Sequence, residues 1–189
     1  MYSTREDWLT QAIEELRPLF QVSGFPLPDK IRVTCGFPSS KARALHRAIG
    51  EHWSPSASAS GHHEILISPV MDDPLEVFGI LVHELCHAAT DGDGHGREFA
   101  KIARSLWLEG KLTETRIGDT FKANMGELIK SLGDYPHAKL NVSALRKPQA
   151  TRMLKAVCPD CGYTIRLSKA WADKGLPVCS NDNSTFVLA

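Results

Sequence analysis

The sequence predicts an α+β protein in which helices and short strands form one domain and a small module rich in turns and cysteine follows it. Three observations support this class. Helical and β-type hydrophobic periodicities follow one another through residues 3–68, an apolar helical segment covers residues 75–89, and residues 153–189 hold three of the five cysteines. A chain of 189 residues has room for one full domain and such an appendage.

The first 68 residues predict one helix and three strands. Residues 3–20 carry apolar side chains at helical spacing, and Ser3 with Glu6 fits a capping box at their start. Three segments are β-branched or alternate in hydrophobicity, namely 31–35, 48–53 and 63–68. We therefore expect a small three-stranded sheet packed on helices.

Three more helices are expected before the C-terminal module. Pro74, which follows two aspartates, starts a largely apolar helix over 75–89, and the Asp-Gly-Asp-Gly run at 91–94 ends it. Further helices are predicted over 96–108 and about 119–132, and Pro148 lies in a polar, basic linker. The expected domain, linker and module are 1–143, 144–152 and 153–189.

The charge of the chain is balanced overall but unevenly placed. The formal net charge is zero, yet the stretch from Lys139 to Lys174 holds eight Lys or Arg and two Asp, a net charge of +6. The N-terminus has no apolar run of signal-peptide length, and nothing approaches the roughly 20 apolar residues of a membrane span. Together with an odd number of cysteines, this predicts a cytoplasmic protein without a membrane partner.

The segment His83-Glu84-Leu85-Cys86-His87 is an H-E-x-x-H motif on a predicted helix. Positions four apart share a helix face, so the imidazoles of His83 and His87 can reach one metal ion. Glu84 projects beside them, where it can act as general base on a metal-activated water. The motif predicts a catalytic zinc site.

A catalytic zinc ion needs a third protein ligand and an open position. The glycines of residues 91–94 let the chain fold back, so His95 can complete a three-histidine site. The alternative is a buried helix whose histidines only hydrogen-bond to neighbours. A calcium loop starting at Asp91 is excluded because its twelfth position is Ile102 instead of Glu.

With these residues, the sequence resembles the SprT-like family of zinc metallopeptidases, which includes the Spartan proteases that degrade DNA–protein crosslinks. The matching pieces cover nearly the whole chain and include a Cys-bearing tail. In chain order they are L-F…F-P-L-P-x-x-I-x-V near 19–33, G-x-x-W at 50–53, E-I-L-I-S at 64–68, L-V-H-E-L-x-H-A at 81–88 and G-H-G-x-x-F at 94–99. Residues 110–113 and the Tyr-Pro-His-Ala run at 135–138 look like the forms in bacterial and phage members.

The resemblance implies a zincin-like core with the H-E-x-x-H motif on its active-site helix. By position, His83, His87 and His95 would be zinc ligands and Glu84 the general base. It also implies a bacterial cytoplasmic, nucleoid or phage-encoded intracellular setting.

The C-terminal module resembles a zinc ribbon. Cys158 and Cys161 form a C-x-x-C-G knuckle, and two such knuckles close a tetrahedral zinc site. In the second knuckle Cys179 is followed by Asp182 where a cysteine is expected, so Asp182 is the candidate fourth ligand of a structural zinc ion. The alternatives are a three-coordinate site with water, or a degenerate ribbon held by its apolar residues.

Basic residues in and before the ribbon, with aromatic residues among them, predict contact with single- or double-stranded DNA. The alternative is a solvated charged face whose aromatic side chains belong to the core. The candidate DNA-binding residues are Arg146, Lys147, Arg152, Lys155, Tyr163, Arg166, Lys169 and Trp171.

The sequence thus predicts a zinc-dependent metallopeptidase that acts on DNA-associated proteins. A non-proteolytic DNA-binding or transcription-associated adaptor and a hydrolase of non-peptide substrates remain as alternatives, because the motif determines the water chemistry and not the substrate. His62 and His63 are not expected to share a metal, since adjacent strand residues face opposite ways. Tyr135 and His137 are expected in a turn that packs the core, with oxyanion stabilisation as the alternative.

Overall fold

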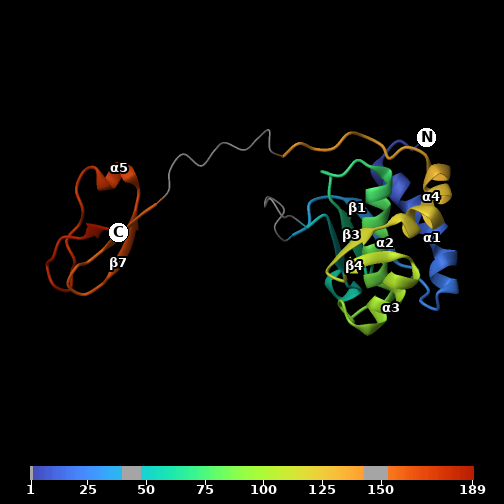
Figure 1. Ribbon diagram of the computed structural model, residues 1–189, viewed down its shortest axis with the longest axis horizontal. Helices are drawn as coiled ribbons and strands as arrows, with labels where there is room; N and C mark the ends of the chain where they lie inside the picture. Colours follow the sequence, from blue (N-terminus) through green and yellow to red (C-terminus); the bar gives the residue numbers. More distant parts are fainter. Residues whose placement is uncertain (1, 40–47, 143–152) are drawn as a thin grey trace. The chain divides into compact units, whose positions relative to one another are not determined.

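The protein is described by a computed structural model over residues 2–39, 48–142 and 153–189 (Figure 1). It divides into two compact units, Met1–Val142 and Ser143–Ala189. Both units combine helices with small sheets, so the predicted α+β class is confirmed. The predicted linker 144–152 lies outside the described residues.

Helix α1 (Arg5–Val22) opens the first unit. Its capping box is formed by Thr4 and Asp7, so the predicted pairing of Ser3 with Glu6 is wrong by one residue. The Ser3 hydroxyl instead donates to the Asp7 carboxylate. Hydrogen bonds with Thr4, and to a smaller extent with Ser3, lower the pKa of Asp7. Ser3 with Glu6 and Thr4 with Asp7 both place a hydroxyl three residues before a carboxylate. The sequence pattern alone therefore does not tell which pair forms the capping box.

The first sheet has the strand order β1-β3-β2, from β1 (Ile31–Cys35), β2 (Gly50–Trp53) and β3 (His63–Ile67). Strand β3 pairs parallel with β1 and antiparallel with β2. Val33, Ile65 and Ile67 are buried on one face, against which the helices pack. On the opposite face Arg32 and Glu64 form an exposed ion pair.

Helix α2 (Pro74–Ala89) packs against β2 and β3. Its N-cap is Asp73, whose carboxylate accepts from the amide of Glu76 at 2.9 Å, and Pro74 is its first residue, as predicted. Helices α3 (Arg97–Ser105) and α4 (Asp119–Leu132) follow.

A hairpin of β4 (Leu108–Lys111) and β5 (Glu114–Ile117) lies between α3 and α4, where the sequence predicted the end of a helix. The helix ends early because Trp107 adopts a left-handed conformation with φ of 60°. Strand β5 packs closely on α2 at Gly79, where a Cβ atom would overlap the side chain of Ile117. This contact holds β5 alongside the H-E-x-x-H helix.

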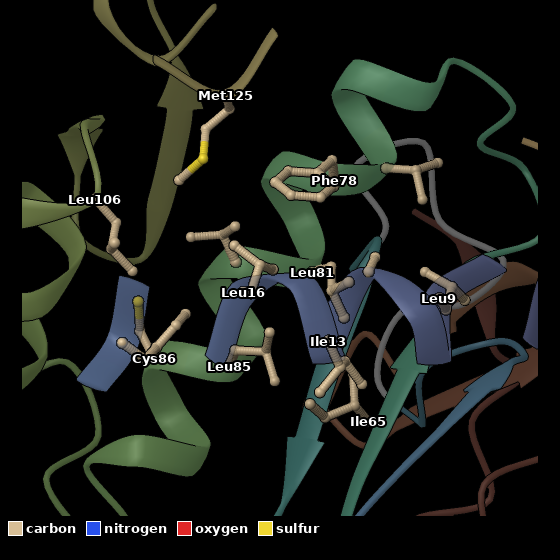
Figure 2. Packing of buried hydrophobic residues seen from close by; sticks show 14 of the residues in the cluster. Leu9, Ile13, Leu16, Ile65, Phe78, Leu81, Leu85, Cys86, Leu106 and Met125 are labelled. Carbon is tan, nitrogen blue, oxygen red and sulfur yellow. The ribbon is translucent and has the colours of Figure 1, made fainter. Parts of the chain in front are cut away.

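The core of the first unit draws on all these helices and on the sheet. Figure 2 shows Leu16 of α1, Phe78 and Leu85 of α2 and Ile65 of β3 in one cluster. Cys86 is fully buried in that cluster, and burial raises its pKa far above the ordinary value of a thiol. It is therefore a core residue rather than a ligand, as its direction on the helix predicts.

The second unit is a small sheet with a short helix. Strand β6 (Leu154–Val157) lies between β7 (Thr164–Leu167) and β8 (Val187–Leu188), and α5 (Lys169–Ala172) follows β7. Its core contains Ala156, Phe186 and two cysteines. Among the described helices of both units, none is long and apolar enough to span a lipid bilayer.

Candidate metal centre

Three histidines converge at the C-terminal half of α2. His83 and His87 lie on one face of the helix, and His95 reaches them from the loop that follows it. One nitrogen of each imidazole lies within 4.8 Å of the other two. All three predicted ligands are thus brought together, close enough to coordinate one ion after small side-chain rotations.

The three imidazoles are held in the neutral form that binds metals. Burial, followed by neighbouring histidines, lowers the pKa of His83 to about 4 and that of His87 to about 3. The pKa of the more exposed His95 is lowered by burial as well. A coordinating nitrogen must be unprotonated, so the donor set suits a transition-metal ion at neutral pH.

The hairpin fixes the orientation of one ligand. Nδ1 of His83 lies 2.8 Å from Oγ1 of Thr115 on β5, a hydrogen bond that leaves Nε2 of the ring free. A hydrogen bond to the second nitrogen is the usual way in which proteins orient a metal-binding histidine. Sequence reasoning missed Thr115 because it missed the hairpin.

A single aromatic ring lies against all three candidate ligands. The ring centroid of Phe99, on α3, lies 5.1 Å from that of His83, 4.4 Å from that of His87 and 4.9 Å from that of His95. Phe99 is completely buried and belongs to the main core. Its packing therefore restricts the rotamers available to the imidazoles.

The loop carrying His95 is shaped by glycine and by one aspartate. Gly92 and Gly94 have φ values of 90° and 59°, in agreement with the predicted turn. The carboxylate of Asp93 accepts from the amide of Phe99 at 2.9 Å, so it satisfies a free donor in the first turn of α3. The loop thereby places His95 and Phe99 relative to each other.

Glu84 lies on the sheet side of the same helix. Its side chain is 6% exposed, and burial, with a smaller contribution from the Glu51 carboxylate, raises its pKa to about 8. Gly50 on β2 leaves room for it, because a Cβ at that position would overlap Oε1 of Glu84. The carboxyl group and the three imidazoles line one cleft between β2, α2 and the β4–β5 hairpin.

The second predicted centre lies within the second unit. One donor atom each from Cys158, Cys161, Cys179 and Asp182 lies within 4.8 Å of all the others. The Sγ atom of Cys158 is 3.3 Å from both carboxylate oxygens of Asp182. The Sγ atoms of Cys161 and Cys179 are 3.6 Å apart.

Two backbone turns of the same form carry these four residues. The amide of Gly162 donates to the carbonyl of Cys158 at 3.0 Å, and the amide of Asn183 donates to the carbonyl of Cys179 at 2.9 Å. Gly162 and Asn183 have φ values of 74° and 59°. Asp182 therefore occupies, in the second turn, the place that Cys161 occupies in the first, and its carboxylate can act as the fourth ligand.

Comparison with models of protein families, with curated proteins and with solved structures finds no match. The geometry of the two candidate centres therefore carries the functional proposal below.

The predicted DNA-binding residues divide into two groups. Arg146, Lys147 and Arg152 lie outside the described residues. Lys155 and Arg166 are exposed and face each other across β6 and β7, whereas Lys169 forms an ion pair with Asp173.

The two aromatic residues predicted to bind DNA are not core residues of the module. Tyr163 is 53% exposed and Trp171 is 64% exposed. The edge of Tyr163 contacts Phe186, and the ammonium group of Lys174 lies 4.7 Å from the centroid of Trp171. The alternative interpretation, in which the aromatic side chains fill the module's core, is wrong for these two residues.

The Tyr-Pro-His-Ala segment lies away from the cleft. Neither Tyr135 nor His137 is among the residues that line it. Tyr135 is buried against Trp8, and the guanidinium of Arg5 donates to the carbonyls of Pro136 and Ala138 at 3.1 and 2.9 Å. Tyr135 packs in the core, as the preferred interpretation predicted, whereas His137 is exposed.

Proposed function

We propose that the protein is a zinc-dependent peptidase. The observation that carries this proposal is the convergence of three neutral imidazoles with one buried carboxyl group, Glu84, in a single cleft. Three histidine ligands with one open coordination position are typical of a catalytic zinc site. A structural zinc site instead has a fourth protein ligand, such as a cysteine or a carboxylate.

The residues around the cleft have distinct roles in this proposal. His83, His87 and His95 would hold the ion, which when bound would act as a Lewis acid and lower the pKa of a water molecule to about 7. Glu84 would act as the general base, accepting a proton from water and passing it to the leaving amine.

We propose proteins bound to DNA as the substrates. This part relies on the second unit, where Lys155 and Arg166 form an exposed basic pair and two exposed aromatic side chains, Tyr163 and Trp171, are available to stack on bases. Asp182 and three cysteines would hold a structural zinc ion that orders this unit.

The deciding experiment is cleavage of a DNA-binding protein by the full chain, with no DNA, single-stranded DNA or double-stranded DNA. We compare wild type with Glu84→Gln, and use Glu127→Gln on the exposed side of α4 as the matched control. Cleavage by wild type and Glu127→Gln but not by Glu84→Gln supports the peptidase, and acceleration by DNA supports the substrate class.

Other outcomes separate the competing functions. Cleavage that DNA does not change would keep the peptidase and remove the proposed substrates. If zinc is bound at the three histidines and no protein is cleaved under any condition, the DNA-binding adaptor becomes the better explanation.

A further inference from the structure

A second group of possible metal ligands faces the same cleft and includes none of the predicted ligands. His52 on β2, His63 on β3 and Asp91 directly after α2 each offer one donor atom, and these atoms all lie within 4.8 Å of one another. His52 and Asp91 line the cleft together with His83 and His87. The three residues are far apart in the sequence.

The register of the sheet explains why the two histidines meet. His52 lies opposite Ile65, so His63, two residues before Ile65, projects from the same face of the sheet. That face is the one against which α2 packs. His62 projects to the other side, where Nδ1 of its ring lies 3.0 Å from the Ser60 hydroxyl.

The separation of the two imidazole nitrogens matches that of ligands on one ion. Nε2 of His52 lies 2.9 Å from Nδ1 of His63. Two nitrogens bound at about 2.0–2.1 Å lie about 2.9 Å apart in an octahedral site and about 3.4 Å apart in a tetrahedral one. The two rings are therefore already placed as neighbouring ligands, and an ion would replace the proton that they share without metal.

The surroundings favour a cation over a simple pair of imidazoles. His63 is 6% exposed, so its ring is largely shielded from solvent. Asp91 brings a carboxylate to the two rings, and the Ser54 hydroxyl donates to that carboxylate at 3.2 Å. Two imidazoles with one carboxylate form a common donor set for divalent transition metals.

We propose that His52, His63 and Asp91 bind a second divalent transition-metal ion in the cleft. The ring of His52 stacks on that of His87 with an interplanar angle of 8° and a centroid distance of 6.0 Å, so this site adjoins the three-histidine centre. Three protein ligands leave coordination positions open to the cleft, where oxygen atoms of a bound molecule can occupy them. This site does not depend on the proposed peptidase activity.

The test is the zinc content of the full chain after removal of metal and dialysis against buffers of defined free Zn²⁺. We compare wild type with His52→Ala and with Asp91→Asn, which changes an exposed side chain and keeps its size. His62→Ala is the matched control, because it removes a neighbouring imidazole from the other side of β3.

The expected result is that both variants lose about one zinc ion per chain relative to wild type and that His62→Ala loses none. Equal zinc contents in wild type and in either variant would overturn the site. Because stoichiometry is measured without substrate, a failed cleavage assay leaves this result unaffected, and the proposed peptidase can fail while the second ion is present.

Discussion

A side chain at position 50 would overlap the carboxyl group of Glu84. Gly50 lies on β2 and Glu84 on α2, so the close packing of a strand on a helix creates the space in which the proposed general base sits. The G-x-x-W motif of the sequence begins with this glycine, although the spacing of the motif gives no reason for it. Three-dimensional packing supplies the reason.

We expect Gly50→Ala to reduce peptide cleavage by roughly 10- to 100-fold, because displacement of a catalytic group by about 1 Å has effects of this size. Metal content should stay unchanged, since the nearest atoms to a Cβ at position 50 belong to Glu84 and Ile80 and not to the three histidines. Steady-state kinetics and metal analysis measure both quantities. Gly126→Ala on α4, where a Cβ meets no atom within 4 Å, is the control. Full activity of Gly50→Ala would show that cleavage does not depend on the position of the Glu84 carboxyl group.

Thr115→Val should weaken zinc binding at the three-histidine centre. The change keeps the shape of the side chain and removes the hydroxyl that orients Nδ1 of His83. Loss of such a supporting hydrogen bond typically lowers metal affinity by about 10- to 100-fold. Competition with a chromogenic chelator measures the affinity. Thr115→Ser restores the hydroxyl and should restore most of the affinity; if it does not, the effect comes from packing.

Asp182→Ala should lower the affinity of the cysteine centre for metal, whereas Asp182→Cys should retain or increase it. The prediction follows from the matching turns, in which Asp182 takes the place of Cys161. Cobalt can replace zinc in the assay, because absorption from thiolate-bound cobalt reports on the cysteine centre and not on imidazole sites. A cobalt spectrum identical in wild type and Asp182→Ala would exclude the carboxylate as a ligand.

The metal-free protein should lose stability in acid through its buried histidines. The ordinary pKa of His87 is 6.5 and its folded value is about 3. Below pH 6.5 the unfolded chain therefore binds a proton that the folded chain does not, so the free energy of unfolding falls as the pH is lowered from 6.5 towards 3.

Urea unfolding in the presence of a chelator, at several pH values, measures this effect in wild type and His87→Gln. The difference in the free energy of unfolding between wild type and His87→Gln isolates the effect of His87, because Glu84 changes the stability of both proteins with pH in the opposite direction. Its folded pKa of about 8 lies above the ordinary 4.5, so its contribution to stability decreases as the pH rises between these values. Parallel curves for wild type and variant over pH 4–6.5 would contradict the prediction.

Lys155→Ala combined with Arg166→Ala should weaken DNA binding equally for different sequences. Removing two phosphate contacts should also make the slope of log affinity against log salt concentration shallower by about 1.8 on duplex DNA. Fluorescence anisotropy at several salt concentrations measures both. The matched control is Lys122→Ala with Lys130→Ala, which removes two exposed lysines from α4. An equal effect of the two double variants would indicate a general charge effect.

The H-E-x-x-H helix could be predicted because its signals are local. Asp73-Pro74 and the apolar spacing that follows predict α2. The glycines after Thr90 predict the loop that brings in His95. The short hairpin was missed for the opposite reason. Its two strands have only four residues each. Three of the four residues of β4 are exposed, and the alternation of β5 is too short to predict a strand.

The pairing of His52 with His63 depends on information that no local pattern contains. It requires the register between β2 and β3, which places residue 52 opposite residue 65. The expectation that His62 and His63 do not share a site rested on their opposite directions, and the contacts of His62 with Ser60 agree with that geometry. The partner of His63 came from another strand, which residue spacing does not reveal.

Phe99 couples ion binding at the proposed metal centre to the packing of the core of the first unit. Its ring lies against all three imidazoles and is at the same time fully buried among the core side chains. An ion that binds only the folded chain shifts the folding equilibrium by mass action, and here that shift acts directly on the packing of the interior. If the proposed zinc ion binds there, the free zinc level of its surroundings would therefore set the fraction of chains in which this unit is folded.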